Sequence, residues 1–217
     1  MEPLIIVLIV LGVIGVAVIA AIQAKKRREA MATLASRLGL SYRPEKNRHI
    51  DDEFRFLTHM GTGSNRYASN MIEGHWRGHE IRAFDYHYET YSTNSKGHRQ
   101  THHHHVSFFV MSMPKWFPEL TITQESFFSK MAQFVGYDDI DFESAEFSKK
   151  FCVRSGDKKF AYDICHTRMM EYLLQNTDLS VEIENHCLAI FFNRLLSVEQ
   201  IEHNLVRLVE IREQFPE

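Results

Sequence analysis

The residues best suited to chemistry in this chain are a run of imidazoles near its middle. The segment HRQTHHHHV, residues 98–106, places four consecutive histidines after His98. Imidazole is a common metal ligand, and zinc takes three or four ligands that converge at about 2.1 Å. Side chains of an extended segment alternate between two faces, so at most two of the four can converge on one ion. We therefore predict, as one alternative, a site for zinc or another divalent metal at His87, His102 and His104.

Two other interpretations of the histidine-rich loop 98–105 stay open. The run can be the end of a polar loop that enters a strand, in which case its imidazoles bind nothing specific. It can also respond to pH, since clustered imidazoles disfavour one another's protons and so lower their average pKa. The chain has 13 histidines, and protonating all of them would change the formal net charge from -3 to +10.

Other catalytic patterns are missing from the sequence. Cys152, Cys165 and Cys187 are widely spaced with no C-x-x-C, which argues against a disulfide framework or a zinc ribbon. No G-x-S-x-G, H-E-x-x-H or phosphate-binding P-loop occurs, and Gly61-x-Gly63 is typical of a turn. We predict no catalytic residues and no cofactor beyond the alternative metal, which favours a binding module over an enzyme.

The N-terminal segment determines the expected location. Residues 4–22, LIIVLIVLGVIGVAVIAAI, are uncharged and span about 28 Å as a helix, close to the thickness of the hydrocarbon layer. The cations Lys25, Lys26, Arg27 and Arg28 follow, and the positive-inside rule places them in the cytoplasm. We predict a single-pass inner (plasma) membrane protein with its N-terminus outside. These four cations are expected to contact lipid headgroups.

The expected organisation and partners follow from this topology. Residues 1–24 form the transmembrane anchor, residues 25–48 a juxtamembrane helix and loop, and residues 49–217 the cytoplasmic α+β domain. The net charge of -3 leaves no basic body for nucleic acid. The expected partners are the lipid bilayer and an unknown membrane or cytoplasmic protein. Ala17 and Ala21, spaced as small-xxx-small, permit a homo-oligomer.

The elements that must position the histidines mix strands and helices without regular alternation. We predict strands at 52–59 and 104–113, and a hairpin that turns at Trp76–Gly78. A second hairpin is predicted to turn at Asn185–His186. Helices are predicted at 123–136, at 157–176 with a break near His166, and after Ser197, whose Gln200 completes a capping box. The pattern predicts an α+β fold, in which the transmembrane helix precedes a mostly antiparallel sheet with packed helices.

Alternation assigns faces to the two strands nearest the histidines. On the strand after the first hairpin turn, Asp85 and His87 share one face with Ile81. Tyr86 and Tyr88 belong to the other face. Asp85 is expected to be a hydrogen-bonded carboxylate rather than a catalytic acid. Residues 106–113 are apolar on both faces, which predicts a central, covered strand.

Several short motifs carry a resemblance to known proteins. They are FDY-x-Y-x-T at residues 84–90, ES-x-EF-x-x-x-F-x-V at residues 143–153, and Asp157 with the later Met169, Met170, Leu173 and Leu174. With these motifs the chain resembles bacterial single-pass membrane-anchored proteins of unknown function that carry a cytoplasmic α+β domain. The resemblance implies a location and a fold, and it assigns no catalytic residue.

Two functions remain as hypotheses from the sequence. The first is a membrane-anchored cytoplasmic binding or scaffolding module that engages a protein or a lipid headgroup at the inner membrane. The alternative is a membrane-tethered metal-binding domain or enzyme that uses the histidine-rich loop.

Overall fold

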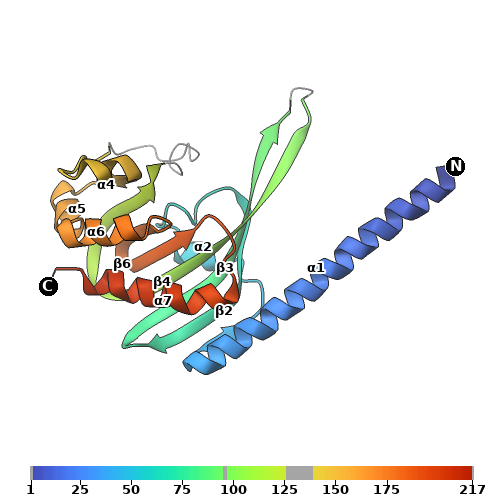
Figure 1. Ribbon diagram of the computed structural model, residues 1–217, viewed down its shortest axis with the longest axis horizontal. Helices are drawn as coiled ribbons and strands as arrows, with labels where there is room; N and C mark the ends of the chain where they lie inside the picture. Colours follow the sequence, from blue (N-terminus) through green and yellow to red (C-terminus); the bar gives the residue numbers. More distant parts are fainter. Residues whose placement is uncertain (1, 95–96, 126–138, 217) are drawn as a thin grey trace.

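The computed structural model describes residues 2–94, 97–125 and 139–216 (Figure 1). A long N-terminal helix precedes an antiparallel sheet and the helices that pack on it, which confirms the predicted α+β class. The helices are α1 (Glu2–Leu38), α2 (Ile50–Glu53), α4 (Ala145–Lys150), α5 (Lys158–Ile164), α6 (Thr167–Gln175) and α7 (Val198–Glu213). The strands are β1 (Ser41–Arg43), β2 (Ser64–Trp76), β3 (His79–Thr93), β4 (Arg99–Gln124), β5 (Phe151–Arg154) and β6 (Ser180–Phe192).

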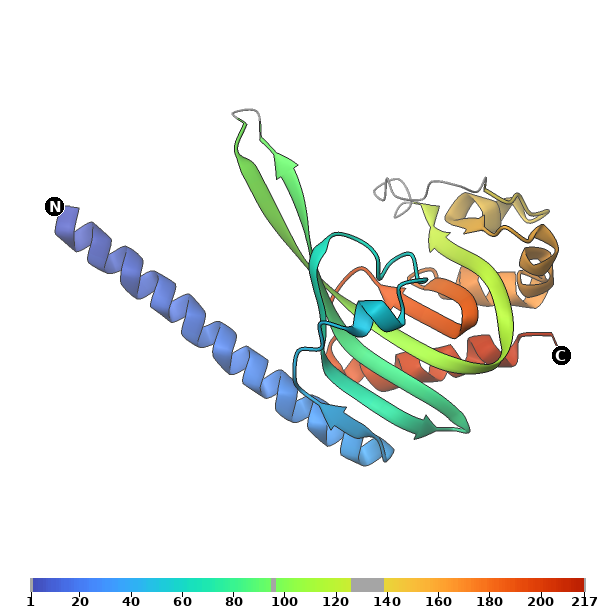
Figure 2. The same cartoon turned by 180° about the vertical axis from the view of Figure 1, so that it is seen from behind.

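Strand β4 is the centre of the sheet. The described strands form one six-stranded sheet in the order β1-β2-β3-β4-β5, and β6 also pairs with β4. All these pairings are antiparallel. Strand β3 pairs with residues 99–111 of β4, β6 pairs with residues 107–122 along its other edge, and β5 pairs with residues 121–124. The second half of β3 and the first half of β4 extend beyond the sheet as a long hairpin arm (Figures 1 and 2).

Each face of the sheet is covered by its own apolar cluster. Helix α7 and the C-terminal part of α1 cover one face, which is toward the viewer in Figure 1. Helix α2 and the turns after it cover the opposite face, seen in Figure 2. Ile81 and Phe109 lie in the first cluster, whereas Phe84 and Phe108 lie in the second. The predicted alternation of β3 and β4, and the central position of β4, are therefore confirmed.

Helix α1 joins the domain without a break. Its apolar residues from Ile5 to Ile22 are exposed, whereas Met31, Leu34 and Ala35 are buried in the core of the domain. By length and composition it could cross a membrane. Gly39, at a φ of +71°, follows its last residue and ends it. The helix runs straight through the predicted boundary between residues 24 and 25, and the domain boundaries themselves stay a prediction.

Several other predicted elements are confirmed. The first hairpin turns at Arg77 and Gly78, both at positive φ, as a tight two-residue turn requires. A helix pair occurs where predicted, and the His166 ring accepts a hydrogen bond from the Met169 amide at the break. Ser197 and Gln200 form the predicted capping box of α7.

Two predicted strand assignments are wrong. The expected strand at 52–59 is the end of α2 followed by turns. Phe54, Leu57 and Met60 are buried at a spacing of three, which suits a turning backbone better than alternation does. The expected hairpin at Asn185 is a single strand, β6, because Asn185 at a φ of +55° lies at an irregularity in the pairing with β4.

The histidine segment is also different from the expected loop. It lies inside β4, because the hairpin arm pairs continuously from Ile81 opposite Met111 to Thr93 opposite Arg99. The helix predicted at 123–136 begins with Thr123, which is in β4, and the remainder of that prediction lies outside the described residues beyond 125.

Candidate functional site

A buried ion pair fastens α1 to the sheet. The Arg27 guanidinium donates two hydrogen bonds to the Asp85 carboxylate, from Nε at 2.7 Å and from Nη2 at 2.6 Å. Its Nη1 donates to the Leu196 carbonyl oxygen at 2.8 Å. The two side chains are only 17% and 10% exposed. A bidentate contact with this little exposure fixes both the position and the rotation of the helix.

Two further side chains hold the Asp85 carboxylate from the other side. Asn70 donates from Nδ2 to Asp85 at 2.8 Å, and the Tyr42 hydroxyl donates to Asn70 Oδ1 at 2.9 Å. Asn70 has a φ of +51° and lies where the pairing of β2 with β3 is irregular, which turns its amide toward β3. Asp85 is therefore the hydrogen-bonded carboxylate that the sequence predicts.

A cleft of about 580 Å³ opens beside this ion pair, between α1 and the strands β2, β3 and β4. Three small or polar residues of α1 line it, namely Ala20, Gln23 and Ala24. With Arg27 and Met31 they share one helical stripe, at spacings of three and four residues. At Met31 this stripe packs tightly on the sheet. Toward the N-terminus, the short side chains of Ala24 and Ala20 leave space between the helix and the strands.

The cleft carries a cationic wall. Arg28 and Lys46 line it, and Lys46 also lies over the Tyr67 ring at 4.2 Å from the centroid. Arg27 and Asp85 neutralise each other. Arg28 and Lys46 therefore give the cleft an excess positive charge. His87 and His105 complete its histidine side. Such a cleft suits an anionic group with an apolar part.

The strand register separates the histidines into two sets. His87 lies opposite His105, and Glu89 lies opposite His103, so these four residues share the face of β3 and β4 that looks toward α1. His102 and His104 belong to the other face. The predicted trio of His87, His102 and His104 is therefore not brought together. Because His87 pairs with His105, side chains alternate so that His102 and His104 lie on the opposite face of the sheet from His87.

On the other face, both histidines already have partners. His104 Nε2 lies 2.8 Å from the Thr90 hydroxyl, and its ring stacks on Tyr88 with centroids 4.6 Å apart. His102 Nε2 lies 2.7 Å from the Ser92 hydroxyl. These contacts stabilise the hairpin arm and do not converge on a common point.

The imidazoles influence one another electrostatically, as the sequence predicts. Burial lowers the pKa of His105, and the neighbouring His87 and His103 lower it further. Burial likewise lowers the pKa of His104, with His102 and His87 adding to the shift. Both rings are consequently neutral near pH 7, which is the form that binds metals.

The four cations after the apolar segment have different roles. Lys25, Lys26 and Arg28 are exposed, and contact with lipid headgroups stays a prediction for them. Arg27 instead faces the domain and is held by Asp85. The sequence contained a signal for this difference, because Arg27 lies one helical turn before the buried Met31, whereas its neighbours do not follow that stripe.

Sequence reasoning missed a second buried polar pair. His59 and Glu182 contact each other through Nδ1 and Oε1, and both side chains are almost fully buried. Burial holds the pKa of His59 well below its ordinary value. The pair joins the turns after α2 to β6, two segments 123 residues apart, so no local pattern indicates it.

The comparisons with known proteins agree with the fold. No protein-family model matches the sequence, and no curated protein matches it. Among solved structures, the crystal structure of the mycobacterial trehalose monomycolate transport factor A, TtfA, is similar with a TM-score of 0.61 and 13% identity. The match covers 89% of this chain and 96% of that chain. At this identity the chain is shown to share the fold of TtfA, with a long apolar helix at its N-terminus.

Proposed function

We propose that this protein is a membrane-anchored module that binds the anionic headgroup of a membrane lipid in the cleft beside α1. The observation that carries the proposal is the lining of the cleft. Helix α1 forms one wall with the end of its apolar segment and also supplies the cation Arg28, and Lys46 adds a second cation from the segment after β1. The likeness to TtfA concerns the fold alone, so the proposal does not extend to the molecule named for that protein.

The position of the cleft along α1 favours a lipid over a soluble anion. The apolar segment ends at Ile22, and the cleft is lined by Ala20, Gln23 and Ala24. If residues 4–22 cross the hydrocarbon layer, the cleft opens at the depth of the headgroups. The hairpin arm leaves the domain toward the side on which the apolar half of α1 projects (Figures 1 and 2).

The continuity of α1 supports an anchor that is retained. Cleavage before Lys25 would remove Ala20, Gln23 and Ala24 from the cleft, whereas the intact helix lines the cleft and continues without a break to Met31 in the core. We further propose that Lys25, Lys26 and Arg28 keep the domain in the cytoplasm, with the N-terminus outside. The test fuses a reporter that is active only outside the inner membrane after Glu217. Activity of this reporter would contradict the proposed orientation.

The charge balance of the cleft favours an anionic headgroup. Among the residues that the structure describes, Arg28 and Lys46 have no carboxylate partner within ion-pair distance. Each cation near a membrane surface contributes about 1 kcal/mol of attraction to anionic lipid. Replacing both should therefore weaken binding by ~30-fold, since 1.4 kcal/mol corresponds to a tenfold change.

The test uses the full-length protein in detergent micelles and a fluorescent phosphatidylglycerol as the probe. The variant R28Q/K46Q should bind the probe ~30-fold more weakly than the wild type. The matched control K25Q/K26Q removes the same charge at the same height outside the cleft, and it should bind nearly as well as the wild type. Equal loss in both variants would indicate general surface attraction and refute the cleft. If no variant and no wild type binds the probe, crosslinking in membranes should then search for a protein partner.

A further inference from the structure

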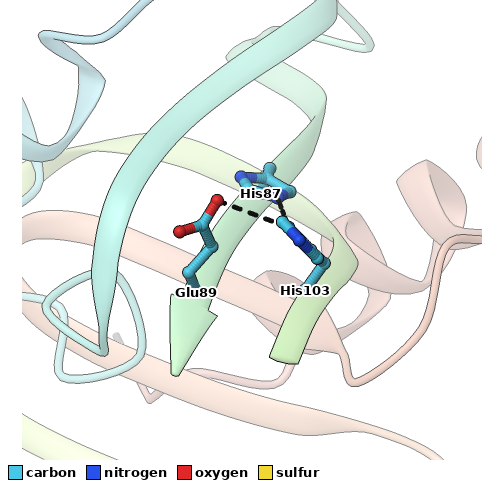
Figure 3. A group of neighbouring side chains, drawn as sticks. All are labelled: His87, Glu89 and His103. Carbon is cyan, nitrogen blue, oxygen red and sulfur yellow. Dashed lines mark hydrogen bonds and ion pairs between the residues drawn. The ribbon is translucent and has the colours of Figure 1, made fainter. Parts of the chain in front are cut away.

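A second group of side chains lies at the edge of the cleft, on the hairpin arm. Figure 3 shows His87 and Glu89 of β3 pointing toward His103 of β4. His103 Nδ1 lies 3.3 Å from His87 Nε2 and 3.3 Å from Glu89 Oε1. One ligand atom from each residue lies within 4.8 Å of both others. Two imidazole nitrogens and a carboxylate oxygen therefore already converge.

These separations match the geometry of a tetrahedral zinc ion. Zinc bonds imidazole nitrogen and carboxylate oxygen at about 2.0–2.2 Å. In a tetrahedron with bonds of that length, neighbouring ligand atoms are about 3.3–3.4 Å apart. The two distances at His103 have this value without any movement of the chain.

Neighbouring groups that hydrogen-bond to the ligands hold them in the orientation that a metal needs. His87 Nδ1 lies 3.1 Å from the Asn65 carbonyl oxygen. A carbonyl can only accept, so Nδ1 carries the proton and Nε2 presents its lone pair toward His103. The Asn65 side chain donates to Glu89 Oε1 at 2.6 Å, and the Tyr91 hydroxyl donates to Oε2 at 3.1 Å. Asn65 thus orients two of the three ligands.

The backbone of Asn65 is itself adapted to this task. Its φ is +49°, in the left-handed region that asparagine tolerates better than most residues, and it lies between register points of β2 and β3. Tyr67 stacks on the His87 ring at a centroid distance of 4.6 Å and restricts its rotation. Metal ligands are characteristically held in place by neighbouring groups in this way.

From this geometry we propose that His87, Glu89 and His103 form a zinc site with three protein ligands and one open position. Two histidines and a glutamate are the protein ligands of several zinc sites that keep a water molecule in the fourth position. His103 is 59% exposed, which leaves an entry path from solvent, while His87 is buried against Tyr67. The zinc site does not depend on the proposed lipid binding, although His87 is both a zinc ligand and a lining residue of the cleft.

Another potential ligand group is less suited to a metal. Glu125, Asp139 and Cys152 also converge, but burial and the adjacent Asp139 raise the pKa of the Cys152 thiol to about 12. The thiolate is the form that binds metals, so this group would have to lose a strongly held proton. The histidine site needs no such step, because a neutral imidazole already offers a lone pair.

The experiment uses the full-length chain without a histidine tag, stripped with a chelator and then dialysed against zinc chloride. Metal analysis should find about one zinc per chain in the wild type. The variants His103→Ala and Glu89→Gln should lose at least ~10–100-fold in zinc affinity, measured by competition with a chromogenic chelator. The matched control His102→Ala/His104→Ala removes two imidazoles from the opposite face of the same strands and should keep the wild-type affinity.

Two more measurements distinguish a built site from general attraction of metal to histidines. Cobalt(II) in place of zinc should give the intense visible absorption of tetrahedral coordination in the wild type and in the control, but not in His103→Ala. Circular dichroism verifies that each variant is folded, and the largely exposed His103 makes unfolding of its variant an unexpected result. A wild type without stoichiometric zinc overturns the proposal. Equal loss of zinc in the control and in His103→Ala overturns it as well.

Discussion

The contact between Arg27 and Asp85 determines how firmly α1 is held by the domain, and its strength can be measured. Arg27 donates two hydrogen bonds to the carboxylate and one to the Leu196 carbonyl. Because both side chains are largely buried, either partner left alone is a poorly solvated charge. Truncating one partner of a buried pair costs about 3–5 kcal/mol, and hydrogen bonds to charged groups contribute about 1.5–3 kcal/mol each.

The residual exposure and the remaining partners reduce this cost. After Arg27→Ala, Asp85 still accepts a hydrogen bond from Asn70, so we expect a loss of about 3 kcal/mol in the free energy of unfolding. Asp85→Ala should cost a similar amount. The double variant should cost little more than either single variant, because the second change removes a charge that has already lost its partner. The expected coupling energy is therefore about 2 kcal/mol.

The assay is urea unfolding of the full-length protein in detergent micelles, followed by tryptophan fluorescence. Both tryptophans, Trp76 and Trp116, lie in the sheet, so the signal reports on the domain and not on the apolar helix. The control cycle uses Lys25 and Glu29, an exposed pair at 3.8 Å on the same helix, for which the coupling should be below about 0.5 kcal/mol. An Arg27–Asp85 coupling as small as that of the control would refute the idea that the pair fastens the helix.

Two further predictions concern the pH dependence of stability and the backbone near the hairpin arm. Burial, with the neighbouring Glu119 carboxylate adding to it, raises the pKa of Glu184 to about 7 from an ordinary value of 4.5. Between these values the folded state keeps a proton that the unfolded chain has lost, so stability falls as the pH rises through this window. Glu184→Gln should show a smaller decline between pH 5 and pH 8 in unfolding titrations, and an unchanged decline would contradict the assignment. Gly63→Ala should lower the melting temperature, because Gly63 has a φ of +70° and a Cβ there would clash with the Glu89 carbonyl oxygen. Gly61→Ala should change little, because a Cβ there would make only an ordinary van der Waals contact with the Thr58 carbonyl oxygen.

Much of the sheet was predictable from the sequence because alternation is a local property. The faces of β3 and β4 follow from which residues are apolar, and the turn at Arg77–Gly78 follows from Gly78, since glycine adopts positive φ without strain. The register of the hairpin arm was not predictable in the same way. It depends on the length of the loop between Thr93 and Arg99, and a loop one residue longer or shorter would place the other histidines beside His87.

The predictions of a strand at 52–59 and of a hairpin at Asn185 are wrong for related reasons. Phe54 and Phe56 suggested the alternation of a strand. An apolar pattern this short, however, fits a turn that packs its side chains against the sheet equally well. Asn185 suggested a turn because asparagine tolerates positive φ, yet the same property serves an irregularity within a long strand. In both cases the deciding contacts come from β4 and its neighbours, which are remote in the sequence.

The contact between α1 and β3 could be inferred only by considering the two elements together. Asp85 follows Ile81 and Ala83 on the buried face of β3, so its carboxylate requires a cationic or hydrogen-bonding partner. Arg27 precedes Met31 on the buried stripe of α1, so its guanidinium requires an acceptor. Neither residue alone indicates its partner, because the chain has many charged residues. Once α1 lies on that face of the sheet, Arg27 and Asp85 each supply the partner that the other requires. Because the same stripe continues to Ala24 and Ala20, breaking the ion pair should also alter the cleft, and the two variants of this pair should weaken lipid binding together with stability.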